Sequence, residues 1–341
     1  DLSGFAPAPG QEYYNYNVQD WEKAGSDTVI LGFTQEPASL FTLVEDAFVA
    51  NIAYQIVRPA QETHLNYDFK ATLVKDLPTL ENGGTVNNDV EVSEGSKVVD
   101  ADGNVVDLAA GVFVMNSAGE KVEFTGGTVT MKQMVSKFEL IDGLTWEDGT
   151  PVSSADLELN KNISCDPESG ATTFTVCDWT ANTEFLTDAV GYIQTWIPGN
   201  QQPIYFTPVW GLYPAHQVIG DGRTLADVPA AEWATLPEVA EKPLAYGPYK
   251  LVEWVKGEKM VFAANEYWVG TPAKSPNLVI QIITPESAEA LLLGGEIDIL
   301  DSTSLAGLSQ TLADAEAAGT IVTFVEAGGT WEHIDIQLFT R

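Results

Sequence analysis

Basic residues are scarce in this sequence: 16 lysines and arginines stand against 49 aspartates and glutamates, and the formal net charge is −33. Proteins that bind nucleic acid neutralise its phosphates with clustered lysine and arginine side chains. The sequence therefore excludes a nucleic-acid partner. An acidic surface of this kind keeps a protein soluble and apart from its own copies, so we expect a monomer.

Long apolar runs are also missing. No stretch of about 18 apolar residues occurs, so no transmembrane helix is expected. The chain has 341 residues, of which 45% are hydrophobic, and this is enough for a large core and for two or three structural units. It starts at Asp1 without a basic and then apolar leader, as expected for a mature or trimmed form of an exported protein.

Catalytic motifs are absent too. The three histidines, His64, His216 and His333, do not occur in a His-Glu-x-x-His pattern, and no Gly-x-Ser-x-Gly run or Gly-Lys-Ser/Thr phosphate loop is present. We therefore expect no enzyme, no cofactor and no metal site. Glycoside hydrolysis by two carboxylates is the alternative that no motif excludes. For His216 we expect a structural, hydrogen-bonded role.

The chain has two cysteines, Cys165 and Cys177, separated by a short segment. In an exported protein we expect them to form a disulfide, which would stabilise the fold by about 3 kcal/mol on the loop-closure model. A metal site with two cysteines is a weaker alternative, because there is neither a Cys-x-x-Cys spacing nor a nearby histidine. Two separate reduced thiols are the remaining alternative.

The apolar pattern predicts the first elements of the fold. Residues 28–33 suit a buried strand, and residues 44–57 repeat apolar side chains at helical spacing. From about residue 77 to residue 140, short β-type runs alternate with turn residues, which indicates a β-rich subdomain. Within it, the acidic segment 100–107 favours a hairpin turn over a calcium loop, because Val105 stands where an EF-hand needs glycine.

Strands and helices alternate in the C-terminal third, which predicts βαβ units and a parallel or mixed sheet covered by helices. Thr284-Pro285 is a favoured helix opening, and Gly294-Gly295 and Gly319 are suited to end helices. The expected elements are a strand at 277–283, a helix at 285–294, a strand at 296–300, a helix at 304–318, and strands at 321–325 and 331–339.

Residues 137–156 form the most informative stretch, because they combine the end of a strand, two turns and the start of a helix. Asp142-Gly143 and Asp148-Gly149 are turn residues that tolerate positive φ. Ser153 and Asp156 are spaced as a capping pair, in which side-chain oxygens accept from unpaired backbone donors at the start of a helix.

This stretch resembles the signature of family 5 extracellular solute-binding proteins, the peptide-binding type that serves ABC transporters. Residues 243–259, 265–270 and 294–298 resemble further blocks of the same family. The departures are mild: Leu157 replaces the usual valine, and Ala245-Tyr246 stands where many relatives have Gly-Thr.

The resemblance implies an α/β fold, the two-lobed type II fold of periplasmic binding proteins, with an inserted β-rich subdomain and a second lobe that is incomplete in this chain. Gly247-Pro248-Tyr249 is expected to belong to a hinge. The expected divisions are an N-terminal arm or linker at 1–26, the first lobe at 27–76 and again at 189–271, the inserted β-rich subdomain at 77–188, and the start of the second lobe at 272–341.

The resemblance also implies a function: an extracytoplasmic, lipid-anchored substrate-binding component of an ABC importer. Such a protein closes around its ligand, and we expect peptides or similarly sized solutes to be passed to permease subunits. An oligosaccharide or another solute on the same fold is an alternative ligand. A sensory or adhesive module without transport is an alternative function.

Eight residues are expected to line the ligand cleft by this resemblance. Most of them also have a structural alternative: core packing for the aromatic residues, a helix cap for Asp301, and a turn fixed by Pro37 for the two earliest positions. The eight are Glu36, Ser39, Trp146, Tyr246, Asp301, Ser302, Trp331 and His333.

Overall fold

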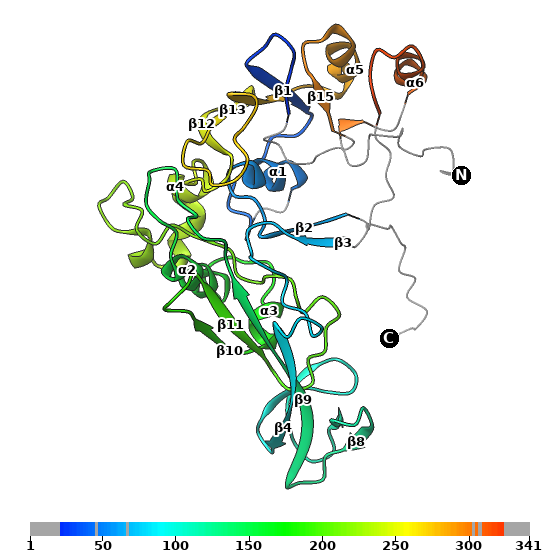
Figure 1. Ribbon diagram of the computed structural model, residues 1–341, viewed down its shortest axis with the longest axis vertical. Helices are drawn as coiled ribbons and strands as arrows, with labels where there is room; N and C mark the ends of the chain where they lie inside the picture. The colour runs from blue at the N-terminus through cyan, green and yellow to red at the C-terminus, as the bar shows by residue number, and fades with distance from the viewer. Residues whose placement is uncertain (1–20, 45–46, 66–67, 302–303, 306–308, 324–341) are drawn as a thin grey trace, which may run out of the picture.

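The computed structural model describes residues 21–323 except 45–46, 66–67, 302–303 and 306–308. Its two largest sheets follow one another along the long axis of the molecule, the sheet that contains β1 toward one end and the sheet that contains β4 and β9 toward the other (Figure 1).

The first sheet has five strands in the order β12, β13, β14, β1, β15. β1 (Thr28–Phe33) lies between β14 (Asn277–Ile282) and β15 (Ile299–Leu300) and is parallel to both. β12 (Tyr249–Val255) and β13 (Lys259–Ala264) extend the sheet as an antiparallel hairpin next to β14. The mixed sheet predicted for the C-terminal third is confirmed, and β1 completes it.

Helices cover both faces of this sheet. Val29 and Leu31 of β1 belong to the same core cluster as the buried side chains of α1 (Phe48–Val57). The intervening residue Ile30 packs instead with the cluster around α5 (Pro285–Gly294). Because successive side chains of a strand point to opposite faces, the apolar run 28–33 is explained by burial on both sides.

The second sheet has four antiparallel strands in the order β10, β11, β9, β4. Their bounds are Thr85–Ser93 for β4, Thr128–Glu139 for β9, Thr180–Phe185 for β10 and Gly191–Trp196 for β11. α2 (Ser154–Ser164) contributes Leu157 to a core shared with Phe138 of β9 and Tyr192 of β11. α3 (Thr175–Trp179) leads directly into β10.

Three two-stranded hairpins stand apart from these sheets in hydrogen bonding. The hairpin predicted around Asp102-Gly103 is confirmed, with Gly103 at a φ of 89°. The hairpins are β2 (Glu62–Leu65) with β3 (Asp68–Ala71), β5 (Lys97–Val99) with β6 (Val105–Asp107), and β7 (Phe113–Met115) with β8 (Lys121–Glu123). Shorter helices among the described residues include η2 (Leu225–Asp227), η3 (Ala230–Thr235), α4 (Pro237–Ala240) and α6 (Gln310–Ala317).

Local signals in the sequence are confirmed where they are strongest. Ser153 and Asp156 form the predicted capping box at the start of α2. Pro285 stands in the first turn of α5, and Gly295 ends that helix in the left-handed conformation. The disulfide between Cys165 and Cys177 is also present, with the two Cα atoms 5.7 Å apart.

Other boundaries differ from the prediction for identifiable reasons. α1 begins at Phe48 rather than residue 44, because Val44 packs with a separate cluster around Trp233. α6 begins at Gln310 rather than residue 304, since Ser309 caps it. Residues 321–323 are not in a strand, while residues 324–325 and the predicted strand 331–339 lie outside the described part of the chain.

The sheets cross two of the expected domain divisions. β14 and β15 pair with β1, so residues after 272 supply two strands of the first sheet. β11 pairs with β9 and β10, so residue 189 does not separate one sheet from another. Pairing between residues far apart in sequence has no local signal, and the domain divisions themselves stay a prediction.

Candidate functional site

The carboxyl ends of three parallel strands meet at one edge of the first sheet. β1 ends at Phe33, which pairs with Ile282 at the end of β14, and β15 ends beside them at Leu300. The turn between β12 and β13 reaches the same edge, because the amide of Ile282 donates to the carbonyl of Glu258. In open α/β sheets, ligands bind at this carboxyl edge. We call it the carboxyl edge below.

Glu36 lies at the carboxyl edge and fastens two of its segments together. Its carboxylate accepts hydrogen bonds from the indole nitrogen of Trp254 at 2.8 Å and from the amide of Gly257 at 2.9 and 3.0 Å. The ammonium group of Lys256 lies 3.1 Å from the centre of the Trp254 ring. Glu36 therefore holds the loop after β1 against the β12–β13 turn, and its contact with a ligand stays a prediction.

The segment after β15 joins the same edge. Ser304 is buried, and its hydroxyl accepts from the amide of Thr34 at 3.1 Å. The carbonyl of Asp301 accepts from the amide of Ser304 at 3.0 Å. Asp301 therefore lies near the loop that follows β1, and its contact with a ligand stays a prediction.

Asp298 fixes the start of β15. One oxygen of its carboxylate accepts from the amide of Ile30 at 2.9 Å, and the other pairs with the ammonium group of Lys23 at 2.7 Å. This residue belongs to the Gly-Glu-Ile-Asp block of the sequence. It therefore sets the position of Asp301 three residues later.

Trp146 and Tyr246 come together at the opposite end of the sheet. Their rings meet edge to face with centres 5.3 Å apart. Tyr246 precedes β12, whose first residue pairs with Ala264 beside the amino ends of β14 and β1. A six-residue strand is roughly 20 Å long, so this pair lies far from Glu36.

Both rings are enclosed by protein groups. Trp146 has no exposed surface, and Tyr246 is 4% exposed. The Tyr246 hydroxyl donates to the carbonyl of Pro59, and burial is the main cause that raises its pKa far above the ordinary range. In this arrangement both side chains pack the core between the two sheets, and their contact with a ligand stays a prediction.

Arg58 is the charged residue at the centre of this aromatic group. It is 4% exposed, and its Nε donates to the carbonyl of Leu244 at 2.6 Å. Its guanidinium carbon lies 5.6 Å from the ring centre of Tyr54, 5.2 Å from that of Trp146 and 5.8 Å from that of Tyr213. Sequence reasoning missed Arg58, although it is one of three arginines and directly follows the apolar run of α1.

The expected hinge segment is held closely by the end of α1. The amide of Gly247 donates to the carbonyl of Val57 at 2.8 Å, and a β-carbon at Gly247 would lie 2.5 Å from Pro59. Asn265 adds a hydrogen bond from its amide nitrogen to the Gly247 carbonyl at 2.8 Å. Glycine is therefore required at this point by close packing and not by its φ angle.

Asp156 ties the signature stretch to the same core. Its carboxylate accepts from the amides of Ser153 at 2.7 Å and Ala215 at 2.8 Å, and from the Trp146 indole at 3.3 Å. His216 pairs with the carboxylate of Asp148 at 2.9 Å, in the structural role expected for it. The signature stretch is thus an anchor for the junction between the sheets.

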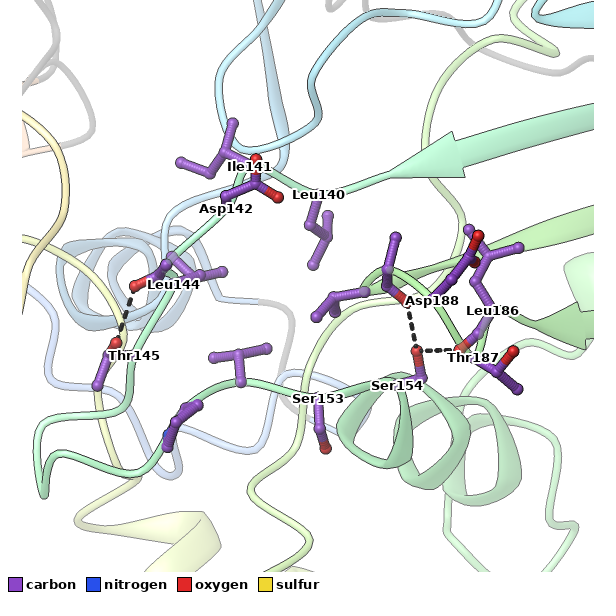
Figure 2. Close-up of a pocket in the computed structure, with 15 residues that line it drawn as sticks. Leu140, Ile141, Asp142, Leu144, Thr145, Ser153, Ser154, Leu186, Thr187 and Asp188 are labelled. Carbon is purple, nitrogen blue, oxygen red and sulfur yellow. Dashed lines mark hydrogen bonds between the residues drawn. The ribbon is translucent and has the colours of Figure 1, made fainter.

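A cavity of about 540 Å³ lies where the signature stretch faces the β10–β11 loop (Figure 2). Leu140, Leu144 and Val152 supply apolar lining on one side. The Ser154 hydroxyl donates to the carbonyls of Leu186 and Ala189 (Figure 2). None of the residues expected to bind the ligand lines this cavity, so the carboxyl edge remains the candidate site.

Four of the eight predicted residues lie either at the carboxyl edge of the first sheet or in the core at its opposite end. Glu36 and Asp301 lie at the carboxyl edge, and Trp146 and Tyr246 pack in the inter-sheet core. The Ser39 hydroxyl accepts from the amide of Phe41 in the loop after β1. Three of the predicted residues, Ser302, Trp331 and His333, lie outside the described residues.

Metal binding finds no support in the described part of the chain. There, no three side chains of His, Cys, Asp or Glu are grouped so as to hold a metal ion. The acidic turn considered for calcium is satisfied internally, because Asp100 accepts from the amides of Asp102 and Asn104. Among the described helices, none is long and apolar enough to cross a membrane.

The mixed sheet, whose carboxyl edge is suited to a ligand, is joined to a second, antiparallel sheet, and the comparison with known families identifies the class of protein. Residues 125–335 match the family described as "Bacterial extracellular solute-binding proteins, family 5 Middle". The chain belongs to this family, which is one of binding proteins and not a class of enzyme. The resemblance found in the sequence is therefore confirmed.

The curated relatives include an oligopeptide-binding protein, OppA, of Lactococcus lactis subsp. lactis (strain IL1403). It is 25% identical in an alignment of 173 positions that covers 46% of this chain and 28% of that protein. The chain therefore spans under a third of the length of this relative in the matched region.

Solved structures of similar proteins share the fold. An oligopeptide-binding protein from Thermus thermophilus, complexed with a pentapeptide, has a TM-score of 0.60 at 16% identity, over 85% of this chain and 47% of that one. The oligopeptide-binding protein AppA from Bacillus subtilis, complexed with a nonapeptide, has a TM-score of 0.56 at 13% identity, over 80% and 44%. NikZ from Campylobacter jejuni, with Ni(L-His), has a TM-score of 0.53 at 19% identity, over 81% and 43%. These likenesses confirm the predicted fold class.

Proposed function

We propose that the protein is the extracytoplasmic substrate-binding component of an ABC importer and binds peptides or solutes of similar size between two lobes. Membership of family 5 supports this function, and the names of three relatives refer to oligopeptides. Delivery to permease subunits, secretion, a lipid anchor and a monomeric state are parts of the same proposal.

The carboxyl edge is the structural observation that carries the proposal. Glu36 and Asp301 place two acidic residues beside the ends of three parallel strands, where a sheet of this kind receives ligands. An acidic partner suits the amino terminus of a peptide, because a carboxylate and an ammonium group attract each other strongly when water is excluded. A peptide is therefore favoured over a neutral sugar at this edge.

The test is to purify the full-length protein from its native host and to identify bound molecules by mass spectrometry under non-denaturing conditions. We expect short peptides to be recovered, and a pool of random-sequence peptides to raise the melting temperature of the emptied protein. Recovery of an oligosaccharide or a nickel complex would show that the ligand is of that class and not a peptide. If no solute is recovered and no peptide raises the melting temperature, the binding function is overturned.

The role of Glu36 needs a matched variant. Glu36→Gln should weaken peptide binding, while Glu168→Gln, an exposed residue of the loop between the two cysteines, should not. Because Glu36 also anchors the β12–β13 turn, the melting temperature without ligand is measured for both variants. Weaker binding with an unchanged melting temperature assigns the effect to the ligand. Equal binding by both variants would contradict a ligand contact at Glu36.

A further inference from the structure

Residues 94–109 and 110–125 align without a gap at a spacing of 16 residues, with 4 of the 16 positions identical. The positions that are identical or similar include the turn residues and the apolar residues of the strands. Identical pairs are Gly95 and Gly111, Val98 and Val114, Gly103 and Gly119, and Val106 and Val122, and similar pairs are Asp100 and Asn116, Asp107 and Glu123, and Leu108 and Phe124.

The strands repeat with the same spacing. β5 and β6 become β7 and β8 when each bound is moved by 16 positions. The register repeats as well, because Lys97 pairs with Asp107 and Phe113 pairs with Glu123. The two segments therefore form hairpins of the same length, spacing and register, called the two copies from here on.

The turns repeat in atomic detail. Asp100 Oδ1 accepts from the amides two and four residues later at 2.9 and 2.8 Å, and Asn116 Oδ1 does the same at 3.0 and 2.9 Å. Gly103 and Gly119 follow with φ angles of 89° and 80°. The same Asx-type turn closes both hairpins.

The hairpins also close at their bases in the same way. The amide of Gly95 donates to the carbonyl of Leu108 at 2.8 Å, and the amide of Gly111 donates to the carbonyl of Phe124 at 2.9 Å. Val98, Val114, Leu108 and Phe124 are all buried in one cluster that the two copies share. A single hairpin is at best marginally stable in water, so stacking of the copies on each other and on the sheet supplies the burial each lacks.

The copies are inserted at the tip of the β4–β9 pair. The last pair of that ladder is Ser93 with Thr128, and the connection between these residues consists of the two copies and Gly126-Gly127. The two glycines have φ angles of 111° and 76°. A two-residue hairpin loop of type I′ requires positive φ at both positions, and Gly-Gly suits it. Removal of both copies would therefore leave a regular hairpin.

This insertion is remote from the carboxyl edge. Figure 1 shows β8 at the opposite end of the long axis from β1 and α5. The copies agree at buried and turn positions and at the exposed pair Asp107 and Glu123, and they differ at other outward positions, for example Lys97 against Phe113, which is 45% exposed. Agreement at the packing and turn positions is what duplication of a self-contained unit would leave.

We propose that residues 94–125 are an accessory module made by tandem duplication of one 16-residue hairpin, and that the number of copies can change without altering the sheets or the carboxyl edge. Each copy has its own turn, its own backbone hydrogen bond at the base of the hairpin and its own buried side chains in the shared cluster. Residues can therefore be removed or added in this module in steps of 16, and not in smaller steps.

The experiment compares deletions in the full chain that differ in register. Deletion of residues 102–117 joins the first half of one copy to the second half of the other and leaves one complete hybrid hairpin. Deletion of residues 102–113 removes fewer residues but joins Ala101 to Val114, which leaves a strand without its partner. Deletion of residues 94–125 removes both copies and leaves the Gly126-Gly127 loop.

Because the copies share one buried cluster with β4 and β9, we expect the 102–117 and 94–125 deletions to melt somewhat below the intact chain but to unfold in one cooperative transition. The 102–113 deletion should melt lower than the 102–117 deletion and be cut by protease within the module. Amide hydrogen exchange of β1 and β14 should be unchanged by removal of both copies. Equal melting temperatures for the 102–117 and 102–113 deletions, or faster exchange in β1 and β14, would overturn the proposal. No ligand is used, so the outcome is independent of the proposed function.

Discussion

Arg58 and Trp146 meet in the core between the two sheets, where the guanidinium carbon lies 5.2 Å from the centre of the indole ring. Arg58 ends α1, and Trp146 belongs to the signature stretch. The same guanidinium group donates a hydrogen bond to the carbonyl of Leu244, which precedes the expected hinge segment. One buried cation thus links α1, the signature stretch and the segment that enters β12.

We expect Arg58→Met to lower the free energy of unfolding by about 3 kcal/mol, because it removes a charge-assisted hydrogen bond and the attraction to three ring faces. Arg58→Lys keeps the charge without the planar donor group, so it should lower the free energy of unfolding by less than Arg58→Met does. Urea denaturation measures the free energy of unfolding of both variants. Arg223→Met is the control, since its ion pairs with Asp221 and Glu232 are at the surface and should matter little. Equal losses at Arg58 and Arg223 would contradict the linking role.

Gly247 tests the close contact at the expected hinge segment. A β-carbon there would lie 2.5 Å from Pro59 and 2.9 Å from the Val57 carbonyl, so Gly247→Ala should cost about 2 kcal/mol through displacement of backbone. Gly220→Ala is the control, because its nearest neighbour would be a flexible Glu238 oxygen at 3.7 Å. Thermal unfolding of the two variants gives the comparison. An unchanged melting temperature for Gly247→Ala would show that the segment can move away freely.

The disulfide predicts a separate loss of stability. Cys165 and Cys177 are 12 positions apart, and reduction should lower the free energy of unfolding by about 3 kcal/mol. A double Cys→Ser variant should show the same loss and should no longer respond to reductant. Denaturation with and without dithiothreitol measures this. A reductant effect that persists in the double variant would contradict the assignment to this bond.

Local signals made much of the fold predictable, and long-range pairing made the rest unpredictable. Thr284-Pro285 specifies a helix start within two residues, and Asp102-Gly103 specifies a turn. That β1 lies between β14 and β15 depends on contacts across about 250 residues of chain, for which no short pattern exists.

The candidate site was predicted only in part for the same reason. The family resemblance marked Trp146 and Tyr246 together, and they do touch, but they touch in the core. A sequence pattern marks which positions matter without separating packing from ligand contact. Arg58 carries no motif, and its importance is visible only once three distant rings surround it.

Glu147 predicts a pH dependence of stability. Burial raises the pKa of its carboxyl group, although a hydrogen bond from the Ala245 amide opposes the shift. A carboxyl whose pKa is raised in the folded state binds its proton more tightly there, so this group lowers stability as pH rises from its unfolded pKa through its folded pKa. Glu147→Gln should therefore be more stabilising at pH 7 than at pH 4, measured as the difference in melting temperature from the parent chain. A larger gain at pH 4 would contradict this assignment.

The excess of acidic residues predicts that salt stabilises the protein. With a net charge of −33, mutual repulsion disfavours the compact state, and the screening length falls from about 10 Å at 0.1 M to about 3 Å at 1 M salt. The melting temperature at pH 7 should therefore rise as sodium chloride is increased over this range. At pH 4, near the isoelectric point of about 4.1, the same titration should have little effect, because the net charge is close to zero. An equal rise at both pH values would instead point to a general salting-out effect on apolar burial.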